Sequence, residues 1–132
     1  MAYQRWTQSN TAVFNIGYHF IWCPKYRRKI LVGTLEGRLK VLLFEKAAEI
    51  DVQIAKLEIM PDHLHIFVKS KPINAPHYIV QQFKGYTSSI LRKEFPELLK
   101  MPSLWTRSYY CESVGHISEK TVLKYIEEQK NK

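Results

Sequence analysis

Residues 52–69 have the sequence VQIAKLEIMPDHLHIFVK. Residues 52–59 and 63–69 are short runs in which apolar and polar side chains alternate, as they do in half-buried strands. Residues 60–62 lie between the runs, and Pro61 and Asp62 favour a tight turn. The stretch therefore predicts an antiparallel hairpin in which Asp62 serves the turn.

The segments on both sides of this hairpin complete the fold prediction. Residues 13–22, which end just before Pro24, and residues 105–113 are rich in β-branched and aromatic residues and predict strands. Residues 35–50 carry apolar side chains at helical spacing, and Asn74 is placed to cap a second helix that Pro96 ends. Ser118 can cap a last helix through about residue 129. The order β-α-β-β-α-β plus a helix predicts an α+β, ferredoxin-like fold: an antiparallel sheet, two helices on one face and an extra C-terminal helix.

Length and composition indicate one domain with a polyanionic partner. A chain of 132 residues, 45% of them hydrophobic, can build one core, so we expect a single domain over residues 1–132. Lys and Arg outnumber Asp and Glu by 20 to 12, which leaves DNA, RNA and an acidic membrane open as partners.

No stretch has the ~20 apolar residues of a membrane span, and no signal peptide is visible, so we expect a cytoplasmic protein. Cys23 and Cys111 suggest neither a disulfide framework nor a thiolate metal cluster.

Two histidines are the first candidates for chemistry. His63 and His65 are two apart in a predicted strand, so both project from one face while Leu64 and Ile66 project from the other. Neutral imidazoles at this spacing can hold one metal ion. Taken alone, a His-x-His pair is more often two half-exposed histidines on a sheet surface.

The predicted C-terminal helix supplies the next candidates. Tyr125 and Gln129 are four apart and share one helical face, while Val122 and Ile126 lie on an adjacent stripe that can pack the helix down. By itself, Tyr125 is better explained as a packing residue.

Together these residues resemble the HUH-type single-tyrosine transposases of small insertion sequences related to insertion sequence 200. The motif of a histidine, a bulky hydrophobic residue and a histidine is matched by His63, Leu64 and His65 within residues 60–65, MPDHLH. Residues 18–27, YHFIWCPKYR, resemble the first strand and basic loop of the family, and residues 82–88, QFKGYTS, resemble its second helix. The resemblance spans nearly the whole chain.

The resemblance implies a mechanism and a set of partners. Tyr125 would be the nucleophile on the C-terminal helix, and Gln129 would join His63 and His65 as ligands of Mg²⁺ or Mn²⁺. The expected activity is metal-dependent cleavage and rejoining of single-stranded DNA through a 5'-phosphotyrosine intermediate, with no small-molecule cofactor. The family also implies recognition of subterminal DNA hairpins and a homodimer whose active sites are shared between subunits, with Gly115 as a hinge before the last helix.

Basic residues outside the motif are candidates for DNA contact. A basic loop combines phosphate-binding charges with an aromatic ring that could stack on a base, and two further cations lie on later segments. These residues are Lys25, Tyr26, Arg27, Arg28, Lys29, Lys84 and Arg107. Gly85 in the second helix suggests close approach of a backbone, and helix packing is the safer interpretation.

Three alternatives compete with a transposase. A host-adapted nickase or ligase of the same family would share the active site, and the position of the gene between subterminal hairpins would separate the two. A non-catalytic RNA-binding ferredoxin-like module would need paired aromatic motifs that residues 63–68 do not match. A structural zinc protein is disfavoured because two histidines and two remote cysteines make a poor tetrahedral set.

Overall fold

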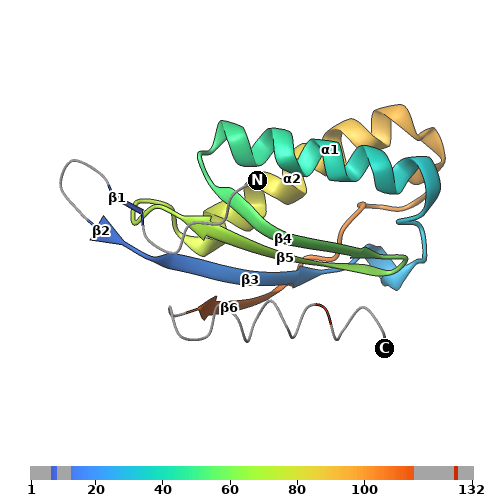
Figure 1. Cartoon of the computed structure of the whole chain (residues 1–132). Helices are drawn as coiled ribbons and strands as arrows, with labels where there is room; N and C mark the ends of the chain where they lie inside the picture. The colour runs from blue at the N-terminus through green and yellow to red at the C-terminus, as the bar shows by residue number, and fades with distance from the viewer. Residues whose placement is uncertain (1–6, 9–12, 115–126, 128–132) are drawn as a thin grey trace.

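The structure is a computed structural model that describes residues 7–8, 13–114 and 127 of the chain. Its main sheet has four strands in the order β4-β5-β3-β6, and every neighbouring pair is antiparallel. The bounds are Ile16–Trp22 for β3, Gln53–Met60 for β4, His63–Ser70 for β5 and Tyr110–Val114 for β6. Helices α1, Gly33–Glu49, and α2, Pro76–Glu94, lie side by side on one face of the sheet (Figure 1). The predicted ferredoxin-like fold is confirmed, whereas the predicted helix from Ser118 to about residue 129 lies outside the described residues apart from Glu127.

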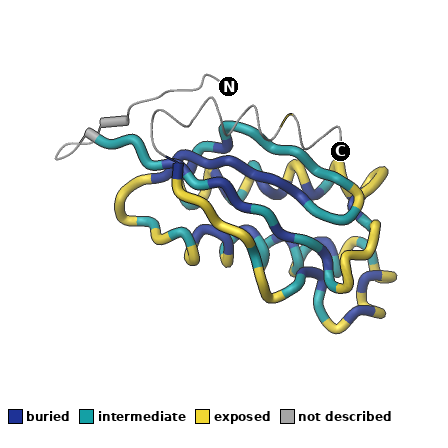
Figure 2. The backbone as a smooth tube through the Cα atoms, turned by 90° about the horizontal axis from the view of Figure 1, so that it is seen from below, coloured by how far each residue is buried: buried dark blue, intermediate teal, exposed yellow. Residues whose placement is uncertain are grey.

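The core lies between the helices and the sheet. Helix α1 buries one stripe of side chains, and α2 does the same with five residues that include Phe83 and Leu91. Leu64, Ile66 and Val68 of β5 are fully buried in the same cluster. Figure 2, which views the molecule from below the sheet of Figure 1, shows buried residues along the central strands. None of the helices in the described part of the chain is long and apolar enough to span a bilayer.

The start of α2 differs from the prediction. Ala75, not Asn74, occupies the N-cap position, and no side chain caps the helix. Pro76 follows, and a residue before proline favours the extended conformation that Ala75 adopts, with ψ of 145°. The amide of Asn74 instead donates a hydrogen bond to the carbonyl oxygen of Ile50 at 3.3 Å, which ties the loop before α2 to the end of α1.

The first and last predicted strands are shorter than expected. The first is divided at Asn15 into β2, Val13–Phe14, and β3, and β2 pairs with β1, Thr7–Gln8, in a separate ribbon. The last begins at residue 110, and upstream of it Trp105 forms an isolated antiparallel bridge with Pro24. Trp105 also packs in the core, with its ring edge against Trp22 and the two ring centroids 6.0 Å apart. The indole N–H of Trp105 donates to the hydroxyl of Thr87 at 3.0 Å. Two short 3-10 turns, η1, Lys25–Arg27, and η2, Pro96–Lys100, follow β3 and α2.

Gly17 of β3 makes room for a buried ring on β5. A Cβ atom added at Gly17 would lie 2.8 Å from Cε1 and 3.2 Å from Cζ of Phe67, whose side chain is fully buried. Because the buried ring would have to shift to admit the methyl group, we expect Gly17→Ala to lower the free energy of unfolding by about 1–3 kcal/mol, measured by urea denaturation. An unchanged midpoint would show that the ring moves aside at no cost.

Gly85 provides the matched control for this substitution. Among the residues that the structure describes, an added Cβ at Gly85 meets nothing within 4 Å, so the predicted close contact with another helix is wrong for this part of the chain. Gly85→Ala should leave the protein as stable as before, or more stable by up to about 1 kcal/mol, because glycine in a helix interior is entropically unfavourable.

Candidate active site

The two motif histidines lie together on β5. His63 and His65 project from the sheet face opposite α1 and α2, since Leu64 and Ile66 between and after them are buried beneath the helices. The ring centroids are 5.1 Å apart, with the planes at 72°. The predicted alternation of side chains along this strand is confirmed.

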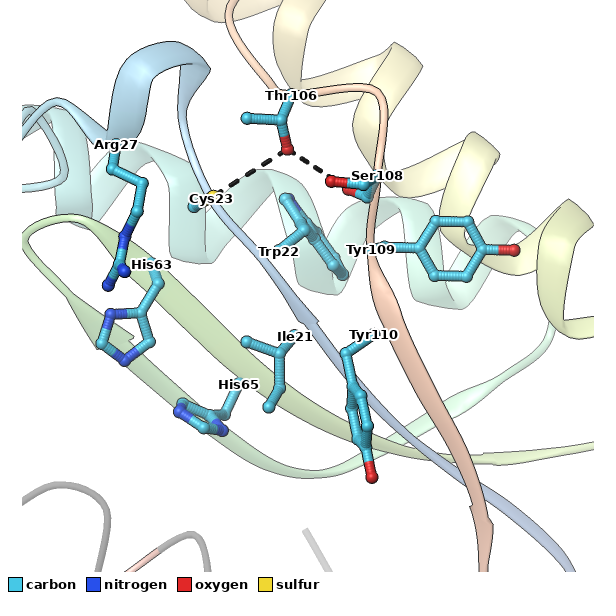
Figure 3. A pocket seen from close by; sticks show the side chains of 10 residues that line it. All are labelled: Ile21, Trp22, Cys23, Arg27, His63, His65, Thr106, Ser108, Tyr109 and Tyr110. Carbon is cyan, nitrogen blue, oxygen red and sulfur yellow. Dashed lines mark hydrogen bonds between the residues drawn. The ribbon is translucent and has the colours of Figure 1, made fainter.

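These histidines line an open pocket of about 590 Å³ at the end of the sheet. Ser108 and Tyr110 close one side of the pocket, and Arg27 lies beside His63 (Figure 3). Tyr110 is half exposed, and its hydroxyl donates to Glu112 Oε2 at 2.8 Å. The pocket thus combines imidazole, guanidinium and hydroxyl groups in a space open to solvent.

Burial keeps His65 neutral. Its side chain is 4% exposed, and desolvation, with smaller repulsion from His19 and His63, lowers the pKa of His65 to about 4. Burial also lowers the pKa of His19, against an opposing attraction from Glu112. A neutral His65 has a lone pair on one ring nitrogen at physiological pH, as a metal ligand requires.

Asp62 connects His63 to Arg27. Its Oδ1 lies 2.7 Å from His63 Nδ1, and its Oδ2 accepts a hydrogen bond from Arg27 Nη2 at 3.1 Å. The hydrogen bond from His63 is the largest cause of a pKa for Asp62 below its usual value, and Arg27 acts in the same direction. The turn role predicted for Asp62 is only part of its contribution, because its carboxylate also orients a motif histidine. The position of Asp62 next to His63 in the sequence was the feature that could have indicated this role.

The donor set fits a divalent metal ion. Nδ1 of His63 contacts Asp62 and Nδ1 of His65 contacts His19, so Nε2 is the atom with which each ring would coordinate a cation. Hydrogen bonds of this kind hold metal-binding imidazoles in position. Within the part of the chain that the structure describes, no group of three or more His, Cys, Asp or Glu could hold a metal ion, so the pair needs a further ligand.

Three of the predicted functional residues fall outside the described residues: Tyr125, Gln129 and Gly115. Glu127, between the first two in sequence, is described and forms an ion pair with Lys56 of β4, which also contacts Glu58 at 3.4 Å. Lys56 is opposite Phe67 in the β4–β5 register and therefore shares the face of the sheet that carries His65.

The predicted DNA-contact residues of the basic loop are divided by the structure. Arg27 lines the pocket that contains His63 and His65. Tyr26 is 66% exposed with a left-handed backbone, φ 62°, and the ammonium of Lys25 lies 5.5 Å from its ring centroid. Arg28 and Lys29 are exposed. Tyr26 thus presents an aromatic surface to solvent next to the pocket residue Arg27.

Lys84 has a structural role that the sequence did not reveal. Its ammonium donates to the carbonyl oxygens of Thr106 at 2.7 Å and Ser108 at 3.1 Å, and burial lowers its pKa. These bonds tie the loop before β6 to α2. Lys84 and Arg107 line a second pocket of about 550 Å³, together with Tyr109.

The fold and this site define an HUH-type domain: a ferredoxin-like sheet whose inner strand presents a histidine, a hydrophobic residue and a histidine at an open pocket. The family model described as "Transposase IS200 like" matches residues 12–129. The chain belongs to the IS200-like transposases, and it is therefore a DNA transposase.

Individual relatives agree with this assignment. The chain is 33% identical to the ISDra2 transposase TnpA of Deinococcus radiodurans, over 91% of this chain and 88% of that protein. It is 27% identical to the transposase for insertion sequence element IS200 of Salmonella typhimurium, over 98% of this chain and 81% of that protein. The crystal structure of a transposase from D. radiodurans has a TM-score of 0.77 at 30% identity, covering 93% of this chain and 97% of that one. A REP-associated tyrosine transposase bound to a REP hairpin shares the fold alone, with a TM-score of 0.59 at 13% identity and coverage of 83% and 61%.

Proposed function

We propose that this transposase cleaves and rejoins single-stranded DNA at insertion-sequence ends through a 5'-phosphotyrosine on Tyr125. The observation that carries the proposal is the pair His63 and His65, whose ring centroids are 5.1 Å apart. Both rings line an open pocket that Arg27 also lines. Cleavage of a phosphodiester needs groups that neutralise the negative charge of the phosphate and hold its oxygens in position while a nucleophile attacks.

The metal ligands in this proposal are His63, His65 and Gln129, with Mg²⁺ or Mn²⁺ as the ion. A bound ion would withdraw charge from a non-bridging phosphate oxygen and stabilise the transition state. Arg27 lines the same pocket and is positioned by Asp62, so its guanidinium would contact the DNA backbone next to the scissile phosphate.

The covalent step conserves the phosphodiester. The hydroxyl oxygen of Tyr125 forms a bond to phosphorus, the bond from phosphorus to the 3' oxygen breaks, and the proton lost by tyrosine is balanced by one gained at the 3'-hydroxyl. Attack by a different 3'-hydroxyl on the phosphotyrosine reverses the step and joins new ends without ATP. Cleavage and joining are thus one reversible reaction.

The assembly in this proposal is a homodimer in which Tyr125 of one subunit meets His63 and His65 of the other, with Gly115 as the hinge. The DNA partner carries subterminal hairpins, and Lys25, Tyr26, Arg28, Lys29 and Arg107 supply further contacts. The ion pair between Glu127 and Lys56 joins the described residue of the predicted C-terminal helix to the sheet face that carries His65, which supports a role for this face in the proposed site.

The experiment that tests the proposal uses DNA from the flanking element end, labelled at either its 3' or its 5' terminus. With Mn²⁺, we expect a protein-linked band on a denaturing gel from the 3'-labelled strand and a free shortened product from the 5'-labelled strand, because the 5' phosphate stays on the protein. EDTA should abolish both, and duplex DNA should be inert. A protein-linked band from the 5'-labelled strand, or one that persists in EDTA, would contradict the mechanism.

A further inference from the structure

A third histidine lies beside the motif pair and belongs to a different strand. His19 of β3 is 1% exposed, and its Nε2 is 3.2 Å from Nδ1 of His65. The two rings are nearly parallel, at 15°, with centroids 5.4 Å apart. His19 is opposite Phe67 in the β3–β5 register, so it is a diagonal neighbour of His65 on the same sheet face.

A hydrogen bond between two neutral imidazoles holds one proton, and its position decides the tautomer of both rings. If His65 Nδ1 carries the proton and donates it, His65 Nε2 keeps a lone pair. If His19 donates, His65 must carry its proton on Nε2, and that nitrogen cannot bind a cation. The direction of this single bond therefore determines whether His65 can act as a ligand through Nε2.

The neighbouring strand favours the first arrangement. When His19 Nε2 accepts the bond, His19 carries its own proton on Nδ1. Glu112 is opposite His19 on β6, on the side of β3 away from His65, and its carboxylate attracts the positive end of an N–H dipole. Tyr110 also packs its ring at 72° to His19, with centroids 6.0 Å apart, which restricts rotation of the imidazole.

We infer that His19 is the positioning residue of His65: it fixes the ring orientation and the tautomer with the proton on Nδ1, as Asp62 does for His63. The two motif histidines thus have different supports, a carboxylate for His63 and a buried imidazole for His65. The link to metal binding rests on the proposed function, whereas the tautomer itself is a property of the metal-free protein.

The first measurement is the tautomeric state of His65 in the full-length, metal-free protein, from long-range ¹H–¹⁵N correlation spectra of the imidazoles. We expect the proton on Nδ1 of His65. In His19→Phe, which keeps a planar ring of similar size without an acceptor, His65 should shift toward the Nε2-protonated form. In His19→Gln, whose Oε1 can accept the same bond, the wild-type tautomer should be retained. A proton on Nε2 of His65 in the wild type, or an unchanged tautomer in folded His19→Phe, would overturn the inference.

The second measurement is Mn²⁺ affinity by electron paramagnetic resonance. Loss of a residue that orients a metal-binding histidine weakens binding by about 10- to 100-fold, which we expect for His19→Phe, with most of the affinity restored in His19→Gln. His77→Phe, a change of the same type on α2, should bind Mn²⁺ like the wild type. Failure of the wild type to bind Mn²⁺ would refute the proposed metal site, while the spectra would still decide the role of His19 independently.

Discussion

Tyr125→Phe is expected to reduce formation of the covalent protein–DNA adduct by more than about 10³-fold if Tyr125 is the nucleophile, because the substitution would then remove the attacking oxygen. Binding of the uncleaved strand should persist, since the aromatic ring remains. The measurement is the yield of adduct on 3'-labelled single-stranded DNA with Mn²⁺, together with the binding affinity for the same strand.

Tyr110→Phe is the matched control for Tyr125→Phe. Tyr110 and Tyr109 are the described tyrosines that line the pocket with His63 and His65, and the hydroxyl of Tyr110 donates a hydrogen bond to Glu112. If Tyr125 is the nucleophile, Tyr110→Phe should still form the adduct. An adduct that survives in Tyr125→Phe but disappears in Tyr110→Phe would move the nucleophile to the described pocket and refute the assignment.

If His63 is a metal ligand, His63→Ala is expected to weaken Mn²⁺ binding by more than about 100-fold, because loss of a ligand should exceed the cost of losing a residue that only orients one. Adduct formation should fall in parallel at limiting Mn²⁺. His63 is a cleaner target than His65, since its side chain is 25% exposed and its removal leaves little buried space. Binding is measured by electron paramagnetic resonance and compared with the unfolding midpoint of the metal-free protein.

Two comparisons separate loss of the ligand from loss of structure. Free imidazole can enter the open pocket and should restore part of the Mn²⁺-dependent activity of His63→Ala. His77→Ala removes an imidazole on α2 that is bonded to Tyr109, outside the pocket lined by His63, and should leave Mn²⁺ binding unchanged. Wild-type Mn²⁺ affinity in His63→Ala would exclude His63 as a ligand.

Local patterns were sufficient for the order of the elements and failed where several conformations compete. The strands β4 and β5 and helix α1 were predictable because period 2 and period 3.6 are properties of the backbone itself. The last strand was predicted too long, because Trp105 forms only an isolated bridge with Pro24 and regular pairing begins at residue 110. Asn74 was misassigned, because an asparagine suits a loop hydrogen bond as well as a helix cap.

The candidate site also has features that the sequence predicted and features that it did not. The sequence by itself determined that His63 and His65 share a face, because side chains two apart on a strand must do so. It also carried the motif that identifies the family, together with Tyr125 and Gln129 as predictions for the C-terminal helix.

Only the tertiary structure decided what surrounds the histidines. His19 is 46 residues from His65 in sequence, and Arg27 is 35 residues from Asp62, so no local spacing relates them. They meet because β3 pairs with β5 in one register, which places His19 diagonal to His65 and brings the turn after β3 to the turn before His63. Strand pairing depends on hydrogen bonds and burial between distant segments, whereas the period of a strand depends on its own backbone. For this reason the motif was visible in the sequence and its supporting residues were not.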